Sequence, residues 1–121
     1  ALTSEVLKRL GYEPVAFSDG AAALAGFEAA PQRFDAVIAD EVMPGLTGTD
    51  LARRLREKRA DLPILLVSGY IGPMMTERAL AAGVDLILKK PVQSRELAAA
   101  LARLLTAVTG KKYTGNLSPV A

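Results

Sequence analysis

The sequence predicts an α/β fold in which a parallel sheet carries helices on both faces. Segments with helical apolar spacing alternate along the chain with short apolar runs, which is the order of strand–helix–strand units. Two of the short runs, 34–39 and 63–67, are apolar almost throughout, as expected of parallel strands covered on both faces. The 121 residues are therefore expected to form one domain over residues 1–108 and a loose polar tail over residues 109–121.

Turn residues and changes of apolar period mark the expected elements in order. Gly11 and Gly83 are natural stops for the helices that precede them, and Pro31 ends an alanine-rich helix. Ser94, with Glu96 close behind, is typical of the start of the last helix. The expected helices span residues 2–10, 21–30, 51–60, 74–82 and 94–108, and the expected strands span residues 13–17, 34–39, 63–67 and 84–88.

The composition excludes several kinds of chemistry. The chain contains no cysteine, so it can form neither a disulfide nor a thiolate metal site. It contains no histidine, so it has no imidazole base for a Ser-His-Asp triad and lacks the usual zinc ligands. Any chemistry must therefore use carboxylates, hydroxyls, lysines and backbone groups.

Charge and hydropathy suggest which partners the domain lacks. The net charge of +2 is small, and the densest basic stretch, residues 53–59, has no aromatic residues that would stack on bases. This stretch is expected to be the solvated face of a helix. No apolar run approaches the roughly 20 residues needed to cross a bilayer. We expect no nucleic-acid partner, no membrane contact by this domain, and a cytoplasmic location.

Polar residues with complementary chemistry follow three of the expected strands. Asp40, Ser68 and Lys90 each stand at or just beyond the carboxyl end of a different strand. Because these ends share one edge of a parallel sheet, where active crevices of such folds lie, the three side chains are expected to converge. A carboxylate nucleophile with an ammonium and a hydroxyl to bind phosphoryl oxygens would suit phosphoryl transfer through an aspartyl phosphate.

Each of these residues also has an ordinary structural interpretation. An Asp after a strand is commonly a turn or cap residue, a Ser before Gly is usually part of a turn, and a Lys after a strand is mostly a solvated charge. Only the joint placement of Asp40, Ser68 and Lys90 favours the chemical interpretation.

Residues 34–45, with the sequence FDAVIADEVMPG, resemble the phosphoacceptor strand and loop of response-regulator receiver domains. In this resemblance Asp40 matches the phosphorylated aspartate. Ser68 matches the Ser/Thr that hydrogen-bonds the phosphoryl group, and Lys90 matches the lysine that pairs with it. The resemblance runs from residue 1 to about residue 108, in the family's order and spacing.

The resemblance implies a flavodoxin-like (CheY-like) doubly wound parallel sheet. It also implies a cis peptide bond at Lys90–Pro91 and a Mg²⁺ ion held in part by Asp40 and the backbone carbonyl of Val42. The implied partner is a histidine kinase or a histidine phosphotransfer domain, and the chain itself would be a phosphoacceptor and not an enzyme.

The sequence departs from this family at its beginning. Receiver domains begin with a strand that ends in two acidic residues that hold Mg²⁺, whereas this sequence begins inside the expected first helix. The first strand and its acidic pair are therefore absent. Glu41 and Asp19 are the nearby carboxylates, but strand alternation points Glu41 away from Asp40, and neither is a convincing replacement. Mg²⁺ binding by this chain is expected to be weak or absent.

In the family's strand order the missing strand is central, so its loss would expose edges of strands 13–17 and 34–39. Three explanations remain open. The chain is a fragment, the two strands close up directly, or a second chain covers the gap as an intertwined dimer. If the isolated chain folds, we expect a homodimer.

A further departure concerns signalling. Ile87 stands where many receivers have an aromatic residue that changes rotamer on phosphorylation, so that response is expected to be absent or altered. Gly69 and Gly72 bracket Tyr70 in a loop that would still allow switching by rearrangement.

The sequence therefore predicts a receiver that takes a phosphoryl group from a phosphohistidine onto Asp40, with a hybrid sensor kinase favoured over a stand-alone receiver as its context. One alternative is a pseudo-receiver that serves only dimerisation or docking. Another is a haloacid-dehalogenase-type phosphatase, which is disfavoured because that family has a second Asp at the position of Val42.

Overall fold

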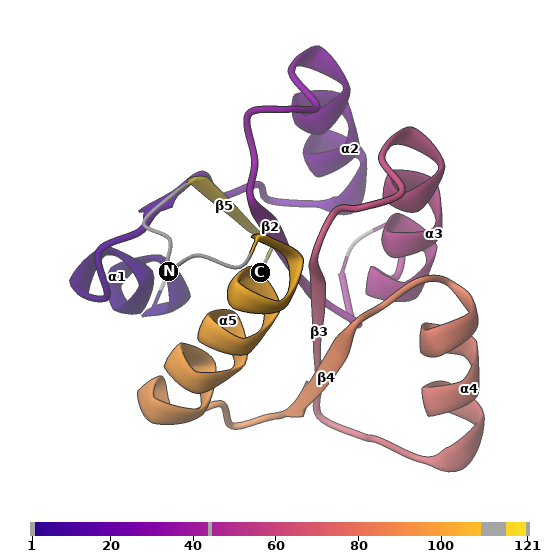
Figure 1. Ribbon diagram of the computed structural model, residues 1–121. Helices are drawn as coiled ribbons and strands as arrows, with labels where there is room; N and C mark the ends of the chain where they lie inside the picture. Colours follow the sequence, from indigo (N-terminus) through magenta and orange to yellow (C-terminus); the bar gives the residue numbers. More distant parts are fainter. Residues whose placement is uncertain (1, 44, 110–115, 121) are drawn as a thin grey trace.

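In a computed structural model, the protein folds into a five-stranded parallel sheet flanked by helices (Figure 1). The structure describes residues 2–43, 45–109 and 116–120, and it describes side chains for residues 4–43 and 45–105. The strand order is β1-β5-β2-β3-β4. The helices are α1 (Leu2–Arg9), α2 (Gly20–Ala29), α3 (Gly48–Lys58), α4 (Pro73–Ala81) and α5 (Ser94–Thr109). The strands are β1 (Glu13–Pro14), β2 (Ala36–Asp40), β3 (Ile64–Ser68), β4 (Leu86–Lys89) and β5 (Asn116–Val120).

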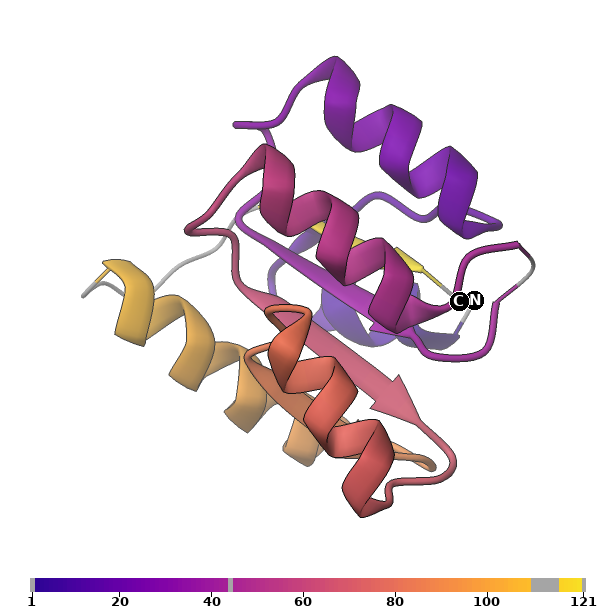
Figure 2. The same ribbon diagram turned by 90° about the vertical axis from the view of Figure 1, so that its right-hand side faces the viewer.

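The helices form a layer on each face of the sheet. Figure 2 shows α2, α3 and α4 side by side on one face, with α1 and α5 on the other. Successive residues of β2 alternate between the two cores: Val37 and Ala39 belong to the cluster under α2, α3 and α4, and Ala36 and Ile38 belong to the cluster under α1 and α5. The predicted doubly wound, flavodoxin-like fold is confirmed.

Local sequence signals explain where several helices begin and end. The Asp19 carboxylate accepts a hydrogen bond from the Ala22 N–H at 2.7 Å and so caps α2. Gly11 and Gly83, the predicted stops, both have a φ of 97°, which suits glycine. Ser94 is the first helical residue of α5 instead of its cap.

The predicted loose tail is wrong over residues 116–120. These residues form β5, which runs parallel to and between β1 and β2, and α5 extends through Thr109. Residues 110–115 and 121 lie outside the described part of the chain. The physical reason is that β2 is buried on both faces, so its backbone N–H and C=O groups need a partner, and β5 supplies one.

The first expected strand is also shorter than predicted. The run 13–17 contributes only Glu13–Pro14 as β1, and β1 pairs with β5, not with β2. Direct closure between strands 13–17 and 34–39 is therefore wrong, because β5 separates them. Filling of the gap by a second chain stays a prediction.

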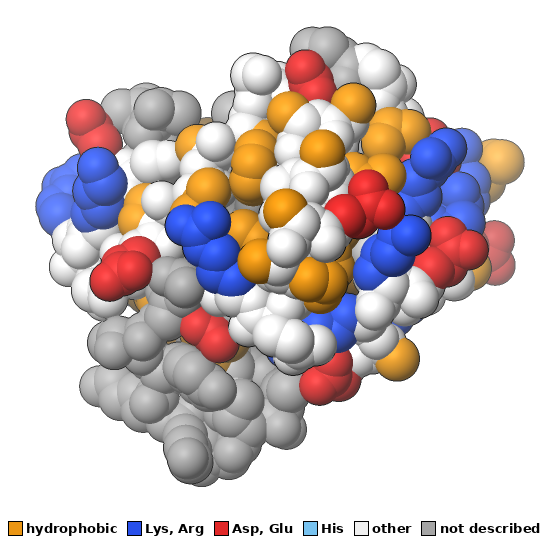
Figure 3. Space-filling model, turned by 90° about the horizontal axis from the view of Figure 1, so that it is seen from above, with side chains coloured by type: hydrophobic (Ala, Val, Ile, Leu, Met, Phe, Trp, Pro, Cys, Tyr) orange, Lys and Arg blue, Asp and Glu red, His pale blue; other side chains and the backbone are white. Residues whose placement is uncertain are grey.

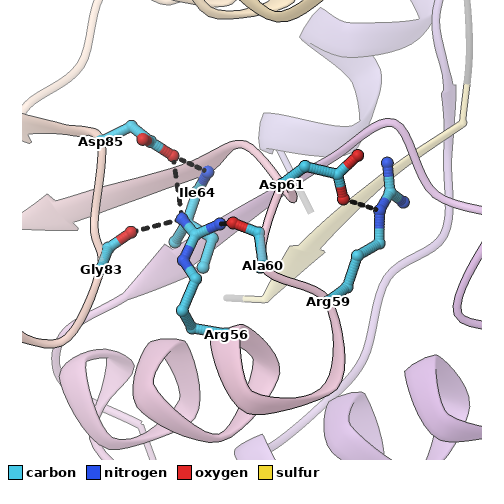
Figure 4. Close-up of polar contacts among 7 residues, drawn as sticks. All are labelled: Arg56, Arg59, Ala60, Asp61, Ile64, Gly83 and Asp85. Carbon is cyan, nitrogen blue, oxygen red and sulfur yellow. Dashed lines mark hydrogen bonds and ion pairs between the residues drawn. The ribbon is translucent and has the colours of Figure 1, made fainter.

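The basic stretch 53–59, which covers the end of α3 and the residue after it, was expected to be solvated, and this expectation is wrong for two of its arginines. Arg56 donates to the carbonyls of Ala60 and Gly83 and to the carboxylate of Asp85, and the Asp85 carboxylate also accepts from the Ile64 N–H (Figure 4). Arg59 pairs with Asp61 at 3.0 Å and donates to the carbonyls of Pro31 and Phe34. Only 23% and 14% of the Arg56 and Arg59 side chains are exposed. These arginines connect the segments that precede β2, β3 and β4. The three segments lie at the amino edge of the sheet, where the amino ends of these parallel strands meet.

The remaining charges of α3 lie at the surface. Arg53 pairs with Asp50, and Lys58 pairs with Glu28 of α2, in ion pairs whose side chains are about half exposed. The space-filling view in Figure 3 shows basic and acidic side chains mixed around a band of hydrophobic side chains on one face of the molecule. That face therefore carries no large patch of a single charge. Among the described residues, no helix combines the length and apolar character that a bilayer span requires.

Candidate functional site

The carboxyl edge of the sheet brings together the three residues that the sequence singled out. Asp40 ends β2, Ser68 ends β3, and Lys90 follows the last residue of β4. The strands are adjacent and in parallel register, with Asp40 paired to Val67 and Ser68 paired to Lys89. The backbone therefore places the carboxyl ends of these three strands side by side, as expected from the sequence.

Backbone hydrogen bonds beyond the strands hold this edge in place. The Glu41 N–H donates to the Val67 carbonyl, and the Lys90 N–H donates to the Ser68 carbonyl, both at 2.9 Å. The Lys90–Pro91 peptide is cis, as expected. The loops that carry the candidate residues are thus joined to one another immediately past the strand ends.

Asp40 and Lys90 are in direct contact. The Lys90 Nζ donates to Oδ2 of Asp40, and Oδ1 of Asp40 accepts from the Val42 N–H at 3.1 Å. The Asp40 side chain is only 14% exposed, whereas 43% of the Lys90 side chain is exposed. A partly buried carboxylate therefore faces a cation that solvent, or a ligand, can reach.

Ser68 is part of the same edge, but its hydroxyl is directed into its own turn. Its Oγ donates to the Tyr70 carbonyl at 2.7 Å and accepts from the Tyr70 N–H at 3.3 Å. The residue is 4% exposed. The Ser68 hydroxyl must therefore exchange its bond to Tyr70 before it can donate to a phosphoryl oxygen.

The other carboxylates considered for the site, Glu41 and Asp19, accept hydrogen bonds from groups outside it. Glu41 Oε1 accepts from the N–H and the hydroxyl of Thr49, at 2.8 and 2.7 Å, in the first turn of α3. The sequence did not reveal this role, because an acid eight residues before its partner matches no capping pattern. Asp19 is the cap of α2. Neither residue takes the role of the acidic pair that the resemblance implies.

The residues present do not fit a complete Mg²⁺ site. Where side chains are described, no group of three or more Asp, Glu, His or Cys residues could hold a metal ion. The strand next to Asp40 does not supply acids either. Ala39 pairs with Val120, so the carboxyl end of β5 lies beside Asp40, yet the sequence of β5 is NLSPV. Asp40 and the Val42 carbonyl alone fall short of the octahedral oxygen ligands that Mg²⁺ requires.

A groove of about 610 Å³ adjoins this edge. It runs from Glu41 and Ser68 to the first turns of α4, and much of its lining is apolar. Val42, Tyr70 and Met74 line it with side chains that are largely exposed. Met74 could not be identified from the sequence, because a lone Met at a helix start carries no pattern of its own.

Comparison with known proteins identifies the family. Residues 1–102 match the family described as response regulator receiver domain. The sensory transduction protein RegX3 of Mycobacterium tuberculosis is 34% identical over 100 residues, which cover 83% of this chain and 43% of RegX3. The chain thus spans less than half the length of this relative. It belongs to the response-regulator receiver family.

Solved structures agree with this assignment. The chemotaxis protein CheY4 of Vibrio cholerae superposes with a TM-score of 0.81 at 32% identity, covering 86% of this chain and 87% of CheY4. The receiver domain of the sensor histidine kinase PA1611 of Pseudomonas aeruginosa, which has a magnesium ion coordinated in its active-site cleft, gives a TM-score of 0.74 at 28% identity. That match covers 91% of this chain and 87% of the PA1611 domain.

Membership of this family defines the class of function. Receiver domains are phosphoacceptor signalling modules of two-component systems. They interact with histidine kinases or phosphotransfer partners, and they generally bind Mg²⁺ in the active site.

Proposed function

We propose that Asp40 is the phosphoacceptor and takes its phosphoryl group from a phosphohistidine of a histidine kinase or a histidine phosphotransfer domain. The contact between Lys90 and Asp40 at the carboxyl edge of the sheet carries this proposal. An Asp oxygen attacks phosphorus, the P–N bond to the donor imidazole breaks, and the imidazole keeps the electron pair and takes up a proton from solvent. The product is an aspartyl phosphate.

Lys90 supplies positive charge to this transfer. Its ammonium ends a flexible stem and has three donors, so it can keep its contact with Asp40 while it turns toward an oxygen of the incoming phosphoryl group. Charge neutralisation of this kind is among the largest contributions to phosphoryl transfer.

Ser68 supplies the second contact. Its hydroxyl leaves the Tyr70 carbonyl and donates to another phosphoryl oxygen, which releases the loop at residues 69–72. This exchange would couple phosphorylation to a change in the position of Tyr70. Ile87, at the position of the family's aromatic switch, is a partly buried core residue in this chain, so the loop is the proposed source of the response.

The metal contribution is proposed to be small in this chain. Mg²⁺ supplies charge neutralisation to receiver domains, and among the residues whose side chains are described only Asp40, with the Val42 carbonyl, is placed to bind it. We therefore expect weak or absent Mg²⁺ binding, and correspondingly slow phosphorylation, unless a strand that ends in carboxylates occupies the place of β5.

The proposed context is the receiver of a hybrid sensor histidine kinase in the cytoplasm. Two similarities support it: the match to the receiver of the sensor kinase PA1611, and the sequence SGYIGP at residues 68–73, which resembles the corresponding loop of such receivers.

One observation favours a second candidate function. No acid lies in the β5 strand beside Asp40, which is what a pseudo-receiver used for docking or dimerisation would show. The homodimer expected from the sequence belongs to this alternative.

Labelling with a small phosphodonor separates the two candidates. The chain and a version extended at its N-terminus by an apolar strand, two aspartates and a short loop are incubated with acetyl phosphate and Mg²⁺. Intact mass should show a gain of about 80 Da, one phosphoryl group, in the extended chain and little in the chain itself.

The substitution Asp40→Asn should abolish this gain, and the matched control Asp19→Asn should keep it, since Asp19 only caps α2. An extended chain that folds but gains no mass would leave only the docking function.

A further inference from the structure

The groove beside the carboxyl edge of the sheet is lined by unusually exposed apolar side chains. Val42, Met74 and Tyr70 are 80%, 75% and 73% exposed, more than any other large hydrophobic residue whose side chain is described. All the lining residues belong to the loop after β2 or to the segment from Ser68 through the first turns of α4. Exposed apolar side chains gathered around one hollow are typical of an interaction surface.

The backbone of the loop before α4 keeps this groove open. A Cβ added to Gly69 would meet no atom within 4 Å, so this part of the lining borders open space. A Cβ added to Gly72 would come within 2.5 Å of the Tyr70 hydroxyl, so the Tyr70 side chain lies over Gly72. The Tyr70 ring is therefore part of the wall, and the hollow of about 610 Å³ has room for a few side chains of another molecule.

The two charged residues of the groove differ in how far they are already paired. Glu41 Oε1 accepts two hydrogen bonds from Thr49 at the start of α3, where the helix dipole also favours a negative charge. The Arg78 guanidinium is exposed and, among the residues whose side chains are described, has neither a hydrogen bond nor an ion pair. The acid is therefore bonded within the chain, and the base is available to an anion.

The spacing of residues on α4 sets what an occupant must offer. Met74 and Arg78 are four residues apart, so they lie on one face of the helix, about 6 Å apart along its axis. An occupant must present an apolar group and an acidic group at a similar separation, which residues three or four apart on a helix provide.

The exposure of the walls favours a protein over a small molecule as the occupant. Pockets for small molecules bury most of the ligand surface, whereas Val42, Tyr70 and Met74 leave this groove open along its walls. Aromatic residues, Met and Arg are also enriched at protein–protein interfaces, and this groove contains all three kinds.

We propose that this groove is a docking site for a helical segment of a partner protein that carries an acidic residue one turn from an apolar one. The apolar side chain enters between the loop after β2 and α4, against Val42, Tyr70 and Met74, and the carboxylate pairs with Arg78. Docking forms no covalent bond and needs no phosphoryl group on Asp40, so it does not rest on the phosphoacceptor function.

Titration with designed helices tests this docking. The probes are alanine-based helical peptides of about 15 residues, long enough to form helix in water, with a leucine and a glutamate three or four residues apart. Each is added to the full isotope-labelled chain without a phosphodonor, and amide shifts are followed by NMR. The amides of residues 69–78 should move, and a peptide with glutamine in place of glutamate should bind about tenfold more weakly.

Substitutions of exposed residues sharpen the test. The unmodified chain should bind the glutamate peptide about tenfold more tightly than a peptide with lysine in its place, and Arg78→Glu should reverse this order. The matched control Arg54→Glu, an exposed arginine of α3 outside the groove, should keep the original order. Met74→Gln should weaken the glutamate peptide about tenfold, whereas Leu80→Gln, an exposed apolar residue of α4 outside the groove, should not.

Three outcomes would overturn the proposal. The first is that no probe moves the groove amides at about 2 mM peptide, and the second is an unchanged order of preference in Arg78→Glu. The third is a chain that sediments as a dimer and that Met74→Gln returns to a monomer, because the occupant would then be a second copy.

Each result can be read separately from folding and from phosphorylation. Circular dichroism checks that each variant is folded, and the comparison of glutamate and glutamine peptides on the unmodified chain needs no variant. Because no phosphodonor is present, a failure of docking says nothing about labelling at Asp40, and a failure of labelling says nothing about docking.

Discussion

The two edges of the sheet use cation–carboxylate contacts in opposite ways. At the amino edge, Arg56 has three acceptors, two of them backbone carbonyls, and its partner Asp85 also accepts from the Ile64 N–H. At the carboxyl edge, Lys90 has one described partner, Asp40, and its side chain is 43% exposed. A planar guanidinium with several acceptors holds the backbone in one arrangement, whereas an ammonium on a flexible stem remains available to a ligand. The first edge stabilises the fold, and the second provides the chemistry.

The largest expected effect on stability is at the amino edge. Arg56→Ala leaves the Gly83 carbonyl and Asp85 without their shared donor, so the free energy of unfolding should fall by about 3 kcal/mol. Urea unfolding followed by circular dichroism measures this loss. The matched control Arg54→Ala, on the exposed side of α3, should change stability by less than about 0.5 kcal/mol. Equal losses for the two variants would contradict the structural role of Arg56.

At the carboxyl edge the same kind of truncation should act on chemistry instead. Lys90→Ala in the strand-extended chain should lower the rate of labelling by acetyl phosphate about 100-fold, because it removes the charge that offsets the phosphoryl oxygens. Its free energy of unfolding should change by less than about 1 kcal/mol, as for other exposed ion pairs. Lys89→Ala, at the neighbouring exposed lysine, should leave both quantities unchanged. A large loss of stability in Lys90→Ala would remove the contrast between the edges.

Ser68 should have a smaller effect on the same reaction. Ser68→Ala should slow labelling about tenfold, the value of one hydrogen bond to a charged group. Ser68→Thr keeps the hydroxyl and should retain most of the rate. Intact mass against time gives both rates, and a Thr variant as slow as the Ala variant would show that the hydroxyl donates nothing to the phosphoryl group.

The smallest expected effect is a pH dependence at the amino edge. The hydrogen bond from Arg59, together with its charge, lowers the pKa of Asp61 from the ordinary value of 3.8. A lowered folded-state pKa contributes stability above the unfolded pKa, and this contribution is lost as pH falls through the folded value. Unfolding temperature measured from neutral pH to below 3.8 should therefore decline slightly more steeply in the unmodified chain than in Asp61→Asn. Parallel curves would show that this exposed pair contributes nothing.

The fold class was predictable because it depends on local patterns. Residues 36–39 of β2 and 64–67 of β3 are all apolar, which indicates strands covered on both faces. The glycines at 11 and 83 end their helices where a positive φ is needed. The convergence of Asp40, Ser68 and Lys90 followed from the same reasoning, since parallel strands place all carboxyl ends at one edge.

What the sequence alone determined is therefore the alternation of strands and helices and the identity of the edge that carries the polar residues. Three features depended on the tertiary structure: the insertion of residues 116–120 between β1 and β2, the direction of the Ser68 hydroxyl toward Tyr70, and the burial of Arg56 and Arg59 among backbone carbonyls. The strand insertion and the arginine burial result from groups far apart in sequence that must satisfy one another's hydrogen bonds once the sheet is assembled. The bond from Ser68 to Tyr70 is local, but a turn of this kind carries no periodic signal. No periodicity in a single segment encodes such a demand, because the unpaired group and its partner meet only in the folded chain.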